Sequence, residues 1–204
     1  MPINETNIQS PINPYGKSKA MVETMLAESA RANGLRTMAL RYFNAAGAMP
    51  TCGLGEAHDP ETHLIPNVLK SLLAAADPIP GDAYVKVFGN DYETEDGSCI
   101  RDYIHVTDLA DAHIRALKYL EKEDRDLLVN LGTSKGLSVF QILETARRVS
   151  GVEFPVTVGP RRKGDPAVVL SSAEKAEKLL GWDPRFSSAE TLLETMLVAY
   201  RDRG

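Results

Sequence analysis

Tyr15 and Lys19 are the residues of this sequence whose types and spacing best suit proton transfer. They stand four positions apart, so a helix would project both side chains from one face. A lysine ammonium near a phenol favours the phenolate, and a tyrosine tuned in this way can act as a general base near neutral pH. The same stripe continues to Val22 and Leu26, which we expect to pack in the core. A tyrosine and a lysine at this spacing could also occur by chance, so the pair alone does not establish the role.

A helix from residue 14 to about residue 33 must position this pair. Asn13 is a favourable N-cap, Pro14 suits the first turn, and Gly34 suits the C-cap. The nearly continuous apolar run 37–43 follows, and it is typical of a strand buried on both faces of a parallel sheet. Asn44 comes directly after this run, where open α/β sheets place ligands, although a simple turn role stays open.

Helical patterns and short apolar runs alternate along the rest of the chain. We expect helices over 66–76, 108–120 and 139–150, and strands over 84–88, 127–131 and 154–158. Ser138, Ser171 and Ser187 each begin a capping-box pattern that predicts the start of a helix. Residues 48–63 lack periodicity and are expected to form a loop. The alternation predicts an α/β fold.

Composition and charge exclude several classes of protein. The 204 residues are 43% hydrophobic and 25% charged, which is typical of a globular chain and not of a disordered or collagen-like one. The net charge of −5, without a basic stripe, argues against a nucleic-acid partner, and we expect no membrane span. The two cysteines, Cys52 and Cys99, cannot build a disulfide scaffold and favour a reducing, cytoplasmic location.

One group of residues has the composition of a metal site. His58, Asp59, Glu61 and His63 are potential ligands, but their spacing matches no compact metal motif. We therefore expect no metal. His105 and His113 are interpreted as structural.

The order of the motifs resembles the extended short-chain dehydrogenase/reductases, and within them the UDP-glucose 4-epimerase family. The less specific part is Tyr15-Gly16-Lys17-Ser18-Lys19 followed by the segment 41–48. The more specific part comprises residues 88–92, 101–106, 108–113, 130–132, 161–167 and 180–182.

This resemblance implies the C-terminal part of an NAD-binding Rossmann fold over residues 1–48. A smaller mixed α/β substrate-binding lobe would follow over residues 49–204. The family's glycine-rich phosphate loop has no counterpart here, because Gly53-Leu54-Gly55 follows a loop and opens no βαβ unit. We therefore expect the chain to be the C-terminal portion of an epimerase that lacks the N-terminal NAD-binding half.

The resemblance also implies an activity, namely NAD-dependent interconversion of UDP-glucose and UDP-galactose through transient oxidation at C4 by a homodimer. Tyr15 would be the catalytic base, and Lys19 would bind the nicotinamide ribose and lower the tyrosine pKa. Tyr42 and Phe43 would join this pair in contacting the cofactor.

The implied substrate contacts lie downstream of the helix. They are Phe43, Asn44, His63, Leu64, Lys86, Val87, Phe88, Arg101, Arg162, Asp165 and Val169. The two arginines would hold the diphosphate, and Asp165 would accept from ribose hydroxyls. From the residues alone, either arginine could be a solvated charge. His63 stands where many relatives have Asn, and the modest size of Val169 predicts that UDP-N-acetylhexosamines also fit.

Two other interpretations stay open. The chain could be a catalytically inactive product that at most binds a UDP-sugar. It could also be an epimerase or dehydratase for another nucleotide sugar.

Overall fold

The computed structural model describes residues 2–76, 84–123 and 125–201. Helix α1 (Pro14–Asn33) begins and ends as the sequence predicts. The Asn13 side chain accepts a hydrogen bond from the Gly16 amide at 2.7 Å, and Gly34 adopts a left-handed φ of 66° at the C-cap. Two short strands, β1 (Met38–Tyr42) and β2 (Asn44–Ala46), and the 3-10 turn η1 (Pro50–Cys52) follow.

Helices and strands alternate through the remainder of the chain, which confirms the α/β prediction. The elements are α2 (Leu64–Ala76), β3 (Val85–Phe88), β4 (Ile100–Arg101), β5 (Tyr103–His105), α3 (Val106–Lys122), β6 (Leu127–Leu131), β7 (Leu137–Ser138), α4 (Val139–Ser150), β8 (Val156–Gly159), β9 (Val168–Val169), α5 (Glu174–Leu180) and α6 (Ala189–Arg201). Among the helices described, none combines the length and the apolar character that a membrane span requires.

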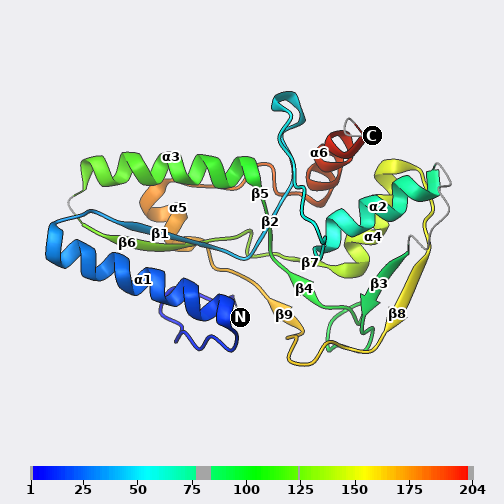
Figure 1. Ribbon diagram of the computed structural model, residues 1–204, viewed down its shortest axis with the longest axis horizontal. Coiled ribbons are helices and arrows are strands. Elements are labelled where there is room, and N and C mark those ends of the chain that lie inside the picture. Colours follow the sequence, from blue (N-terminus) through cyan, green and yellow to red (C-terminus); the bar gives the residue numbers. More distant parts are fainter. Residues whose placement is uncertain (1, 77–83, 124, 202–204) are drawn as a thin grey trace.

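The first region of the fold is built on β1 and β6, which pair in parallel from Met38 opposite Leu127 to Tyr42 opposite Leu131. Helices α1 and α3 lie on opposite sides of this pair (Figure 1). A buried cluster around Trp182 joins α3, α5 and β6, and Met38 packs against it. A parallel β-bridge between Ile3 and Ser171 joins the first residues of the chain to the segment that follows β9.

The second region contains the parallel pair β3–β8 and the helices α2, α4 and α6 (Figure 1). Its core is larger and includes Ile65, Leu72, Ile142, Leu192 and Met196. The three-stranded sheet β7-β4-β9 carries Arg101. Residues after position 100 return to pack beside β1, so the division after residue 48 stays a prediction.

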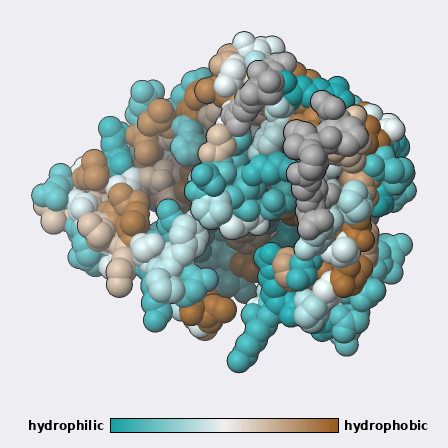
Figure 2. Space-filling view, turned by 45° about the vertical axis from the view of Figure 1, so that its right-hand side comes forward, coloured by the Kyte–Doolittle hydropathy of each residue, from teal (hydrophilic) through white to brown (hydrophobic). Residues whose placement is uncertain are grey.

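The predicted burial of the first helix and strand is wrong for the described structure. None of the residues of α1 is buried, and Val22 is exposed. Strand β1 is only half-buried because β6 is its one strand neighbour among the described residues. On the face shown in Figure 2, hydrophobic side chains reach the surface in separate patches.

Only one of the three predicted capping boxes forms. Ser138 accepts from the Gln141 amide while the Gln141 side chain accepts from the Ser138 amide. The boxes predicted at Ser171 and Ser187 are wrong, although helices do begin nearby. The Ser171 amide donates to the buried Asp102 carboxylate, and the Ser187 hydroxyl donates to Asp108.

The physical reason is competition from distant carboxylates. A charged acceptor forms stronger hydrogen bonds than a neutral backbone group does. Helix α5 therefore begins after Ala173 without a side-chain cap. In α6, the neighbouring Ser188 accepts from the Thr191 amide instead.

Candidate active site

A cavity of about 1310 Å³ lies where the two regions meet, between the end of β1, the N-terminus of α1, β3 and β4. It exceeds the 300–1,000 Å³ typical of a site for one small ligand. Most of the predicted site residues line it. They are Tyr15, Tyr42, Phe43, Asn44, His63, Leu64, Lys86, Phe88, Arg101, Arg162 and Asp165.

Three predicted site residues do not line this cavity. Val87 is buried in the core of the second region. Val169 on β9 lies opposite Arg101 on β4, in a parallel register. Lys19 is exposed on α1, but its Nζ lies 5.2 Å from the centre of the Tyr15 ring. The predicted tyrosine–lysine pair therefore does form.

The tyrosine stands at the solvent-facing side of the cavity. Tyr15 is 72% exposed and is the second residue of α1, directly after the capped N-terminus. The Lys19 ammonium one turn later places a positive charge beside the phenol ring. The arrangement can therefore exchange a proton with a group bound in the cavity.

Positive charge collects on the β3–β4 side. Arg101 donates to the Asp165 carboxylate at 2.7 Å, and its side chain is only 15% exposed. The Arg162 guanidinium lies 3.9 Å from the centre of the Phe88 ring, and the Lys86 ammonium lies 5.4 Å from it. Guanidinium groups pair with phosphate oxygens through two parallel hydrogen bonds, so this side of the cavity suits an anionic ligand.

Asn44 and His63 are both held by neighbours. The Asn44 side-chain amide donates to the Asp102 carbonyl at 2.9 Å, which fixes the side chain at the edge of the cavity. His63 Nδ1 lies 2.6 Å from a carboxylate oxygen of Glu56. These contacts orient two side chains for which the sequence predicts a substrate role.

Sequence analysis did not identify several lining residues, among them Tyr103 and Cys99. Burial raises the pKa of the Tyr103 phenol and, chiefly by the same effect, that of the Cys99 thiol. Both groups therefore stay protonated near neutral pH. Strands of two and three residues carry too short a pattern to reveal which side chains face a cavity.

His105 lies outside the cavity lining and holds the end of a helix. It is buried, its Nδ1 accepts from the Thr107 amide at 3.0 Å, and its Nε2 lies 3.1 Å from the Thr195 hydroxyl. Burial lowers its pKa, so the neutral ring that can accept at the cap is favoured. The contacts of His113 are likewise local, because its Nδ1 lies 2.7 Å from the Leu109 carbonyl.

The comparison with known families follows the same order of motifs. Residues 1–132 match the NAD dependent epimerase/dehydratase family. The chain belongs to this family.

Individual members of the family resemble the chain over nearly its whole length. It is 48% identical over 194 residues to the UDP-glucose 4-epimerase of Halalkalibacterium halodurans. The aligned residues make up 95% of this chain and 56% of that enzyme. The UDP-glucose 4-epimerase of Brucella ovis in complex with NAD superposes with a TM-score of 0.89 at 46% identity, over 97% of this chain and 59% of that one. The Bifidobacterium longum enzyme, solved with NAD+ and UDP, gives a TM-score of 0.86 at 35% identity, over 99% of this chain and 59% of its own.

These shares show that the chain spans somewhat more than half the length of the epimerases that it matches. The comparison therefore concerns the part of those proteins that this chain represents.

Proposed function

We propose that this chain supplies the UDP-sugar site and the catalytic Tyr–Lys pair of a UDP-glucose 4-epimerase. The reaction would be the NAD-dependent interconversion of UDP-glucose and UDP-galactose. The observation that carries the proposal is the meeting of Tyr15, Asn44, Arg101 and Arg162 at one cavity. The names of the relatives at 46% and 48% identity support it.

Substrate binding would use the cationic side of the cavity. Arg162 and Arg101 would hold the diphosphate, and Phe88 with the neighbouring backbone of Val87 would line the uridine. Asp165 would accept from ribose hydroxyls. A carboxylate can accept about four hydrogen bonds, so its bond to Arg101 leaves capacity for this role. His63 and Leu64, which also line the cavity, would contact the substrate too.

Proton transfer would take place at the Tyr15 hydroxyl. The tyrosinate would accept the proton of the sugar 4-hydroxyl, and the Lys19 ammonium would stabilise the anionic form of the base. Bound NAD would supply the hydride acceptor for C4. Asn44, fixed by Asp102, would help to orient the sugar.

The residues present fit one end of the NAD molecule. Tyr15, Tyr42 and Phe43 form a polar and aromatic edge of the cavity, with Lys19 beside the Tyr15 ring, that suits the nicotinamide ribose. The cavity is also larger than a sugar nucleotide alone requires. The printed sequence contains no glycine-rich turn between a strand and a helix for the pyrophosphate. The residues of this chain would therefore hold the nicotinamide end of NAD.

The proposal is tested by measuring UDP binding and epimerisation on the same purified chain. UDP binding is followed by calorimetry, and conversion of UDP-galactose to UDP-glucose is followed with NAD added. We expect Tyr15→Phe to lower turnover by about 100-fold or more and to leave UDP affinity unchanged. Binding without turnover would replace the enzymatic proposal with that of a UDP-sugar-binding chain. Absence of UDP binding would overturn both.

We further propose that UDP-N-acetylhexosamines are accepted. Val169 does not itself line the cavity, but it is paired in register with Arg101, which does, and a valine beside Arg101 leaves more room than an aromatic side chain would. Val169→Tyr should lower kcat/KM for UDP-N-acetylglucosamine more than for UDP-glucose. Equal losses on both substrates would contradict this role.

We also propose that the protein is a cytoplasmic homodimer. Cys52 and Cys99 are free thiols, which fits a reducing compartment. Sedimentation should give about twice the 22.3 kDa of one chain, and a single-chain mass at micromolar concentration would overturn the dimer.

A further inference from the structure

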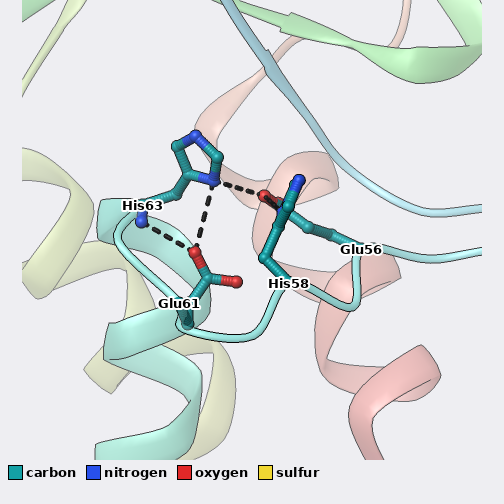
Figure 3. Close-up of side chains that lie close together, drawn as sticks. All are labelled: Glu56, His58, Glu61 and His63. Atoms are coloured by element: carbon teal, nitrogen blue, oxygen red, sulfur yellow. Dashed lines mark hydrogen bonds and ion pairs between the residues drawn. The ribbon is translucent and has the colours of Figure 1, made fainter.

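The loop between η1 and α2 brings four potential metal ligands together. One ligand atom from each of Glu56, His58, Glu61 and His63 lies within 4.8 Å of the others. Figure 3 shows their side chains gathered on one side of the loop. The spacing of these residues matches no compact metal motif, so their meeting is a consequence of the loop conformation.

The two histidines converge on one carboxylate. An oxygen of Glu56 lies 2.9 Å from His58 Nδ1 and 2.6 Å from His63 Nδ1. An oxygen of Glu61 lies 3.2 Å from His63 Nδ1 and also accepts from the His63 amide at 2.7 Å. Two imidazole nitrogens and two carboxylates therefore surround a common point.

Glu61 provides an independent indication of a missing partner. Its side chain is only 2% exposed. Its Oε2 atom is buried and has no hydrogen-bond partner among the residues that the structure describes. A buried carboxylate oxygen without a partner destabilises the folded chain, and a bound cation would supply the partner.

We propose that Glu56, His58, Glu61 and His63 bind one divalent transition-metal ion, with Zn²⁺ the best match to the donor set. Imidazole nitrogen combined with carboxylate oxygen suits zinc, whereas Mg²⁺ and Ca²⁺ favour sites made of oxygen alone. The site would be a mixed His₂Glu₂ site on the wall of the cavity, since all four residues line it.

The geometry allows an ion to enter with small adjustments. Zinc bonds of about 2.1 Å in a tetrahedron place neighbouring ligand atoms about 3.4 Å apart. The contacts of 2.6–3.2 Å within the cluster would open slightly, and its widest separation of 4.8 Å would close. The side chains of His58 and His63 are 59% and 58% exposed, so their rings can turn and the ion can arrive from solvent.

The ion would also change the charge beside the cavity. It would offset the two carboxylates and tie together both ends of the segment 56–63. The loop would then hold His63 in one position against the cavity. The metal site itself is independent of which ligand the cavity takes.

The test is a zinc titration of the whole purified chain after treatment with a chelator and dialysis. Calorimetry should show one Zn²⁺ per chain, and Co²⁺ used as a coloured probe should give the absorption of a site with nitrogen and oxygen ligands. His58→Ala and Glu61→Gln should each weaken binding by about 10-fold or more. His58 is exposed, so its replacement keeps the test valid even if the Glu61 variant folds poorly.

Matched controls come from elsewhere on the surface. His113→Ala and Glu144→Gln replace an exposed histidine and an exposed glutamate outside the cluster, and each should bind Zn²⁺ as the parent chain does. Binding that is equally strong in the cluster variants and in the controls would overturn the proposal. A folded parent chain that binds no Zn²⁺ would also overturn it.

Discussion

The two sides of the cavity are positioned in different ways. Arg101 lies on a central strand, is bonded to Asp165 and is largely buried, whereas Tyr15 projects from a helix without a buried residue. Long-range packing fixes the arginine side, while helix spacing and one cap fix the tyrosine side. The difference indicates that the position of Arg101 depends on the packing of the second region, whereas the position of Tyr15 depends on α1 and on the contact of α1 with β1.

The largest loss of stability should come from removing the carboxylate of Asp102, the residue after Arg101. Asp102 is fully buried and accepts from the amides of Thr133, Ser134 and Ser171 and from the Thr133 hydroxyl. Asp102→Ala leaves these donors unpaired and should lower the free energy of unfolding by about 4 kcal/mol, as measured by urea denaturation.

Asp126 provides the matched control for Asp102. It also accepts from an amide and a hydroxyl, both of Thr37, but it does so at the surface. Asp126→Ala should lower the free energy of unfolding by about 1 kcal/mol. Equal losses in the two variants would show that burial of Asp102 does not matter.

The next largest effect should be a loss of affinity for UDP when Arg101 is replaced. Arg101→Ala should weaken UDP binding by about 10-fold or more, and Arg101→Lys should recover little because lysine lacks the planar fork. Calorimetry with UDP measures both, and Arg31→Ala, on an exposed pair, is the control. Unchanged UDP affinity in Arg101→Ala would place the diphosphate elsewhere.

A smaller effect is expected where α1 meets β1. Glu23 on α1 accepts from Arg41 on β1, with one contact at 2.6 Å. Hydrogen bonding from Arg41 is the largest cause that lowers the pKa of Glu23, against an opposing effect of burial. Glu23→Gln should lower the free energy of unfolding by about 1 kcal/mol at pH 7.

The pH dependence of this loss follows from the direction of the shift. A lowered pKa in the folded chain stabilises it above the ordinary value of 4.5 and stops doing so as the pH falls through the folded value. The difference between parent and Glu23→Gln should therefore shrink below about pH 4.5. A difference that stays constant from pH 7 to pH 3 would contradict the ion pair.

The smallest effect is a difference in thiol labelling. Cys52 is exposed, whereas Cys99 is half-buried at the cavity with a raised pKa. Maleimide should react with Cys52 first, and UDP should slow the labelling of Cys99 by a few-fold while Cys52 is unaffected. Mass spectrometry of the labelled peptides distinguishes the two sites. If UDP slows both thiols equally, the protection does not arise at the cavity.

Local features of the fold could be predicted from the sequence. The caps of α1, the Tyr15–Lys19 spacing and strand β6 depend on neighbouring residues, and the structure has them as predicted. The site residues beyond α1 were predicted from the resemblance, because nothing in the local pattern distinguishes Arg101 from a solvated charge. Their assignment to substrate remains a prediction.

Long-range features could not be predicted. Asp108 accepts from Arg185, Phe186 and Ser187, whose positions are 77 to 79 residues away. A local sequence pattern cannot predict a contact over this separation. The cap predicted at Ser187 is therefore wrong, because the Ser187 hydroxyl donates to Asp108 instead. The sequence offers His58, Glu61 and His63 as potential ligands, but their spacing predicts no metal. Their approach to one another and to Glu56 depends on the path of one irregular loop, which no spacing rule describes.

The bridge between Ile3 and Ser171 has a consequence for biosynthesis. The Ile3 amide donates to the Leu170 carbonyl, and the Ser172 amide donates to the Ile3 carbonyl, both at 2.8 Å. The Ile3 carbonyl also accepts from the Asn130 side chain at 3.0 Å. The segment around Ile3 therefore gains its first distant partner once residue 130 has been made, and it completes its backbone bonds only after residue 172. Until these partners have been made, the Ile3 amide and carbonyl remain exposed to solvent, and chaperones can bind this part of the nascent chain.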